Sequence, residues 1–138
     1  MIKVLGIEHV GIALNSNKQL SKIFNDIFGL EYIGSEVVAE QGVNTDIFNV
    51  ANTKIELLEP ISEDSPINKY ISKYGQGMHH IALVVEDIES AIKHLISNDI
   101  TMIDEKPKIG VEGYKIAFIH PKSTPGLLIE ICQKQIGS

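Results

Sequence analysis

The sequence contains an internal repeat, and this repeat limits the possible fold more than any other feature. The segment "IEHVGIAL" begins at residue 7 and "HHIALVV" begins at residue 79, so His9 and His80 both open an apolar run. Side chains alternate between the two faces of a strand, which places His80, Ala82 and Val84 on the same face. Each run therefore predicts a strand that starts with one histidine on a chosen face of a sheet.

Each predicted strand is followed by a segment with the apolar spacing of an amphipathic helix. Ser16 and Asp87 stand where helix N-caps are expected, and Gly29 stands just past the end of the first helix. The apolar positions are Leu20, Ile23, Phe24, Ile27 and Phe28 in the first helix, and Ile88, Ala91, Ile92, Leu95 and Ile96 in the second.

Three short strand-like segments, separated by turn residues, follow each helix, so each half reads as β-α-β-β-β. They are "EYIGSEVV", "TDIFNV" and "TKIELLEP" in the first half, and "TMIDEKP", "YKIAFIHP" and "GLLIEICQ" in the second. Between the halves, Ser65 as N-cap and Pro66 at the first helical position predict a short helix with Ile67, Tyr70 and Ile71 on one side.

The repeat predicts a single α+β domain over residues 1–138 in which two tandem βαβββ modules form a curved mixed sheet. The first module covers about residues 5–60, the connector about 61–76, and the second module about 77–135. Modules of this size bury little of a sheet on their own, so they are expected to pack together or to exchange elements in a homodimer.

Four ionisable residues stand at repeat-related positions in otherwise apolar strands: His9, Glu56, His80 and Glu130. The spacing is 47 residues from His9 to Glu56 and 50 from His80 to Glu130. A single histidine on an apolar strand is more often a hydrogen-bonded core residue than a ligand. Because the pattern occurs twice, and because two histidines and two glutamates suit zinc, nickel, cobalt or manganese, we expect a metal site.

These residues and the motifs around them resemble the vicinal oxygen chelate (glyoxalase-like) superfamily and, within it, the methylmalonyl-CoA epimerase family. The resemblance runs from "IEHVGIAL" to "LLIEICQ" and includes "EQGV", "TKIELLEP", "SPI", "GMHHIAL" and "AFIHPKS". It implies the paired βαβββ fold around one divalent ion held by His9, Glu56, His80 and Glu130. Cobalt is the ion that the resemblance favours, with manganese, nickel and zinc as alternatives.

The resemblance also implies an activity, the interconversion of (2R)- and (2S)-methylmalonyl-CoA in propionate metabolism by proton transfer at C2 through an enolate. Glu130 is the first expected acid/base. Some members of the family carry a glutamate three residues after the glycine of "EQGV", where Thr45 stands here. A one-residue bulge would let Asp46 serve instead, and Glu40 is a further candidate. Lys122 is expected either to meet a CoA phosphate or the substrate carboxylate, or to be an ordinary surface lysine.

Two other functions stay open at this point. Glyoxalase I, a lyase acting on the hemithioacetal of glutathione and methylglyoxal, has the same fold and a similar His/Glu set, so the ligands cannot separate it from an epimerase. A non-catalytic small-molecule-binding protein is a third alternative. The four filled ligand positions count against it.

Charge and composition narrow the partners further. The net charge is −6 and the 12 Lys and Arg residues are scattered, which argues against a nucleic-acid partner. The opening "MIKVLGIEHVGIAL" lacks the apolar run of a signal sequence or membrane span, so we expect no membrane association. Cys132 is the single cysteine, which rules out an internal disulfide and favours a cytoplasmic location.

Overall fold

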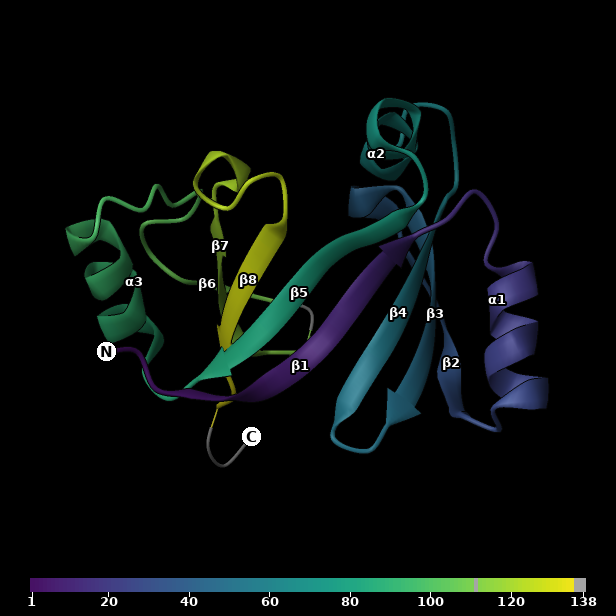
Figure 1. Ribbon diagram of the computed structural model, residues 1–138, viewed down its shortest axis with the longest axis horizontal. Coiled ribbons are helices and arrows are strands. Elements are labelled where there is room, and N and C mark those ends of the chain that lie inside the picture. Colours follow the sequence, from purple (N-terminus) through teal and green to yellow (C-terminus); the bar gives the residue numbers. More distant parts are fainter. Residues whose placement is uncertain (111, 136–138) are drawn as a thin grey trace. The chain divides into compact units, whose positions relative to one another are not determined.

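The computed structural model describes residues 1–110 and 112–135, and the chain forms two compact units. The first unit is His9–His79, and the second unit combines Met1–Glu8 with His80–Ser138. Both boundaries fall inside strands, because β1 (Val4–Ala13) and β5 (Gly77–Val85) each contribute residues to both units (Figure 1).

The first unit has the βαβββ order that the repeat predicts, followed by the connector helix. The strands lie in the order β2-β3-β4-β1; β1 and β4 are parallel, and the other pairs are antiparallel. After β1 the elements are α1 (Lys18–Lys22), the π-helix η1 (Ile23–Ile27), β2 (Glu31–Val38), the 3-10 helix η2 (Ala39–Gln41), β3 (Val43–Val50), β4 (Thr53–Pro60) and α2 (Pro66–Tyr74).

The second unit repeats this order, and its strands lie in the sequence β5-β8-β7-β6 with β5 and β8 parallel. The α+β class and the mixed pairing of strands are thus confirmed in both units. After β5 the elements are α3 (Ile88–Ser97), β6 (Lys108–Ile109), β7 (Lys115–Ile119), the 3-10 helix η3 (Pro121–Ser123) and β8 (Leu128–Gln133). Among the described residues, no helix is long and apolar enough to cross a membrane.

Each face of the first unit's sheet is covered by a different helix. On one face, the fully buried Phe48 of β3 packs edge-on against Phe24 of η1, with ring centroids 5.5 Å apart. On the other face, α2 buries Ile67 against residues of three strands. This second cluster contains the buried residues Ala13, Val43, Leu58 and Ile67, with Val38, Tyr70 and Ile71 packed against them.

In the second unit, α3 covers one face of the sheet through an apolar cluster. Ile88, Ala91 and Ile92 of α3 pack with residues of β5, β7 and β8. The strand residues of this cluster are Val85, Ala117, Ile119 and Ile131. Because Ile131 follows Glu130 directly in β8, the side chain of Glu130 belongs to the face that α3 does not cover.

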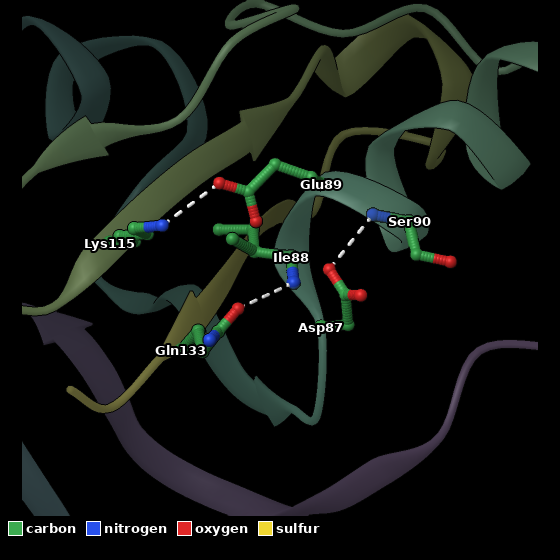
Figure 2. A network of polar contacts seen from close by, with 6 residues as sticks. All are labelled: Asp87, Ile88, Glu89, Ser90, Lys115 and Gln133. Carbon is green, nitrogen blue, oxygen red and sulfur yellow. Dashed lines mark hydrogen bonds and ion pairs between the residues drawn. The ribbon is translucent and has the colours of Figure 1, made fainter. Parts of the chain in front are cut away.

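Polar contacts fix the start of α3, as Figure 2 shows. The carboxylate of Asp87 accepts a hydrogen bond from the Ser90 amide at 3.2 Å, which confirms the predicted N-cap. The side-chain oxygen of Gln133 accepts a bond from the Ile88 amide at 2.8 Å, and Lys115 pairs with Glu89 at 2.9 Å. The first turn of α3 is therefore tied to both β7 and β8.

The N-cap prediction holds for α2 but is wrong for α1. Ser65 accepts a hydrogen bond from the Ile67 amide, as a cap should. In the first helix, Asn17 rather than Ser16 is the N-cap residue, and its side chain makes no cap bond. The side-chain amide of Asn17 instead donates hydrogen bonds to the backbone carbonyls of Asn44 and Leu57, at 3.1 and 2.9 Å, because this side chain is buried beside the sheet.

The predicted strand "TMIDEKP" is wrong, since Met102 forms only an isolated bridge with Ile119 and β6 begins six residues later. The Ile103 amide donates to the Phe118 carbonyl at 2.8 Å, but the Phe118 amide donates to the side-chain carboxylate of Asp104 at 2.9 Å. A side chain thus replaces the backbone acceptor that a continuing strand would supply. Pro107 follows and cannot donate a ladder hydrogen bond.

Replacement of Phe48 by alanine is expected to destabilise the protein by about 3–5 kcal/mol, because a fully buried aromatic ring leaves a cavity. Chemical denaturation measures the change. Phe28→Ala is the matched control: its side chain is 68% exposed, so a much smaller loss is expected. Equal losses in the two variants would contradict this description of the core.

Replacement of Asn17 by alanine is expected to lower the free energy of unfolding by about 1–3 kcal/mol, because one buried and one partly buried carbonyl group lose a hydrogen-bond donor. Thermal unfolding of Asn17→Ala and of the exposed control Asn15→Ala gives the comparison. If both variants unfold at the same temperature as the unchanged protein, Asn17 does not join the helix to the sheet in the way described.

Candidate functional site

His9 and Glu56 lie together on one face of the first unit's sheet. In the parallel pairing of β1 and β4, Glu56 stands opposite Gly11, and His9 precedes Gly11 by two residues on the same face. The Nδ1 atom of His9 is 3.6 Å from Oε2 of Glu56, and the side chains are only 12% and 21% exposed. We call this surface the His9 face.

The separation of these two atoms fits a shared metal ion. Nitrogen and oxygen ligands of zinc each lie about 2.0–2.2 Å from the ion, so two of them can be at most about 4.4 Å apart. The His9–Glu56 distance falls within this limit. Neutral histidine and carboxylate are also a donor set that suits divalent first-row metals.

The second unit places His80 and Glu130 in the same relation. In the parallel pairing of β5 and β8, Glu130 stands opposite Ala82, and His80 precedes Ala82 by two residues. Glu130 is 8% exposed and lies on the face away from α3. Both halves of the repeat therefore put a histidine two positions before the strand partner of a glutamate.

Cys132 shares the face of Glu130, since it lies two residues further along β8. Burial of the thiol, followed by the charges of Glu130 and Glu8, raises the pKa of Cys132 to about 12. The thiol therefore stays protonated at neutral pH. This counts against a role as a thiolate nucleophile.

The structure does not bring Asp46 to the His9 face. The register of β3 and β4 is unbroken from Val43 to Val50 and pairs Asp46 with Leu57, while Ile47 is the residue opposite Glu56. The Asp46 carboxylate accepts hydrogen bonds from the Ser21 and Tyr32 hydroxyls at 2.9 and 3.4 Å. The bulge that would have turned Asp46 toward Glu56 is absent from β3 and instead lies in β2, between Tyr32 and Gly34.

The two other predicted residues lie in short 3-10 helices. Glu40 is exposed in η2, and Lys122 is exposed in η3, where its backbone amide donates to Nδ1 of His120 at 3.1 Å. Thr45, in contrast, is buried and stands opposite Leu58, which places it on the His9 face. A threonine thus occupies the place where similar sequences are expected to carry a carboxylate.

Tyr70 lies near the site, and the sequence analysis assigned it no functional role. Its ring packs edge-on against the ring of His79, with centroids 4.6 Å apart, and burial lowers the pKa of His79. The apolar side of the connector helix was the one sequence signal for Tyr70, and that signal indicates packing alone.

Comparisons with known proteins agree with the fold. The model of the Glyoxalase/Bleomycin resistance protein/Dioxygenase superfamily matches residues 8–118. The uncharacterized protein YqjC of Bacillus subtilis is 38% identical over 92% of this chain and 91% of its own length. The mitochondrial methylmalonyl-CoA epimerase of Dictyostelium discoideum is 38% identical over 93% of this chain and 78% of its own length.

A solved structure gives the same result. A methylmalonyl-CoA epimerase in complex with methylmalonyl-CoA superposes with a TM-score of 0.81 and 28% identity, covering 97% of each chain. This confirms the paired βαβββ fold that the repeat predicted. The chain belongs to the Glyoxalase/Bleomycin resistance protein/Dioxygenase superfamily and, within it, to the family of the methylmalonyl-CoA epimerases.

Proposed function

We propose that this protein is a methylmalonyl-CoA epimerase, which interconverts the 2R and 2S forms of its substrate by moving one proton at C2. The observation that carries the proposal is the identical register of the two His/Glu pairs, His9 with Glu56 and His80 with Glu130. The named enzymes among the relatives are epimerases, and one is solved with methylmalonyl-CoA.

We propose further that the two pairs hold one divalent metal ion, with the ligands drawn from one chain or from two. We propose His9, Glu56, His80 and Glu130 as its ligands, because imidazole nitrogens and carboxylate oxygens suit divalent first-row metals. Cobalt is the preferred ion, with manganese, nickel and zinc as alternatives. When bound, the ion would act as a Lewis acid toward the negative charge that develops on the thioester oxygen.

Glu130 is the proposed acid/base on one face of the substrate carbon. Glu130 is 8% exposed and lies on the face away from α3, so it is largely shielded from bulk water. Inversion needs a second group on the opposite face of C2. Glu40 remains the proposed second group, because Asp46 is turned away and bonded to Ser21 and Tyr32.

Lys122 is proposed to bind the negatively charged part of the substrate. Its ammonium group is exposed and forms no ion pair within residues 1–110 and 112–135. A phosphate of CoA or the substrate carboxylate would therefore not have to displace an internal partner. We also propose that the enzyme is a cytoplasmic homodimer, because modules of this size bury a smaller share of their surface than larger domains do, and Cys132 is a free thiol.

The epimerase fits the comparisons better than the two alternatives. Glyoxalase I uses the same fold, but the relatives that bear an enzyme's name act on acyl-CoA thioesters rather than on a glutathione adduct. A binding protein without catalysis would have no need of the second His/Glu pair in the same register. The exchange experiment described next distinguishes the epimerase from both alternatives.

Protein freed of metal with a chelator and then reloaded with cobalt is expected to exchange the C2 proton of methylmalonyl-CoA for deuterium in heavy water. Loss of chirality should accompany exchange, because the planar enolate can be reprotonated from either face. The metal-free protein should show background exchange. Proton NMR and a chiral assay of the thioester measure the two effects.

The same samples test the alternatives. Consumption of methylglyoxal with glutathione, without exchange at C2, would replace the epimerase by glyoxalase I. Silence in both assays would contradict an enzyme of either type.

Replacement of Glu130 by glutamine is expected to lower kcat by at least about 100-fold, because the amide cannot take a proton from C2. The fold should persist, since glutamine has nearly the same volume. Glu105→Gln is the matched control, an exposed glutamate in the same unit, and it should retain full activity. Near-normal turnover by Glu130→Gln would remove Glu130 from the mechanism.

A further inference from the structure

The connector helix α2 is fixed on the His9 face. Ile67 of α2 is 5% exposed and packs with Ala13, Val43 and Leu58 of the first unit's sheet. Leu58 lies two residues beyond Glu56 on the same face of β4. The helix therefore covers the part of the His9 face that directly adjoins the His9–Glu56 pair.

Tyr70 joins this helix to the start of β5 through two contacts. Its hydroxyl donates a hydrogen bond to the carbonyl of Met78 at 3.1 Å. Its ring meets the His79 ring edge-on, with an interplanar angle of 78°. Met78 and His79 are the two residues that directly precede His80 in the chain.

We infer that Tyr70 is a positioning residue for His80, holding the backbone before this ligand so that the imidazole is presented to the metal in one orientation. The inference rests on the proposed function, in which His80 is a metal ligand. A ligand that is held in place before the ion binds loses less conformational freedom on binding. Residues that orient a metal ligand typically change metal affinity by about 10–100-fold when they are replaced.

The second tyrosine of α2 offers a matched control. Tyr74 is 63% exposed and contacts the ring of Tyr70 at 5.0 Å and the ammonium of Lys73 at 5.2 Å. Within the described part of the chain, its hydroxyl makes no hydrogen bond. Replacing either tyrosine by phenylalanine removes one hydroxyl and keeps the ring, but only Tyr70→Phe removes a bond to the strand.

The test compares Tyr70→Phe with Tyr74→Phe in two measurements. In metal-free protein, NMR of the ring nitrogens follows the five histidines individually. Tyr70→Phe should shift or broaden the signals of His79 and His80 and leave those of His94 and His120 unchanged. In cobalt titrations followed by visible absorption, Tyr70→Phe should bind about 10-fold more weakly, at the lower end of that range, and Tyr74→Phe should bind like the unchanged protein.

Two outcomes would overturn the inference. One is a Tyr70→Phe variant whose His80 signals and cobalt affinity match those of Tyr74→Phe. Another is a change spread over all five histidines, which would indicate general loosening of the fold. If the unchanged protein binds no cobalt but Tyr70→Phe still changes only the His79 and His80 signals, the metal proposal fails while the positioning of His80 by Tyr70 is supported.

Discussion

The site depends on the parallel pairing of the first and last strands in each unit. In both pairings the glutamate stands opposite the residue two places after the histidine, Gly11 in one unit and Ala82 in the other. Gly11 and Ala82 are both buried small residues, which leaves room beside the two larger polar side chains. A shift of either register by one residue would turn the glutamate to the opposite face of its sheet, which is packed against η1 in the first unit and against α3 in the second.

In the second unit, this pairing gives the two faces of the sheet different roles. One face is covered by a helix and carries an apolar cluster, such as Ile131 against α3, and the other carries Glu130 and Cys132. Burial of a carboxylate lowers stability unless a partner compensates for the lost hydration. The apolar cluster on the opposite face can offset such a cost, so that a polar site on a sheet does not prevent folding.

The sequence predicted the parts of the fold that depend on periodicity, and it failed where one side chain competed with the backbone. The helix cap at Asp87 and the strands carrying His9 and Glu130 follow from spacing alone. The side chains of Asn17 and Asp104 form hydrogen bonds with backbone atoms that are distant in the sequence, and no local sequence pattern predicts such bonds. The predicted role of Asp46 required a bulge in β3. The position of a bulge depends on how β2 pairs with β3, and the sequence alone does not reveal this pairing.

The repeat makes the two histidines equivalent, but the residues before them are held by different interactions. His80 follows Met78 and His79, which Tyr70 ties to a helix that occurs once in the chain. His9 follows Glu8, which is 6% exposed and forms an ion pair with Lys134 at 3.4 Å. Either contact restrains the strand directly before a proposed ligand. A duplicated ligand pattern therefore does not require duplicated supports, and residues beside the two histidines were free to diverge.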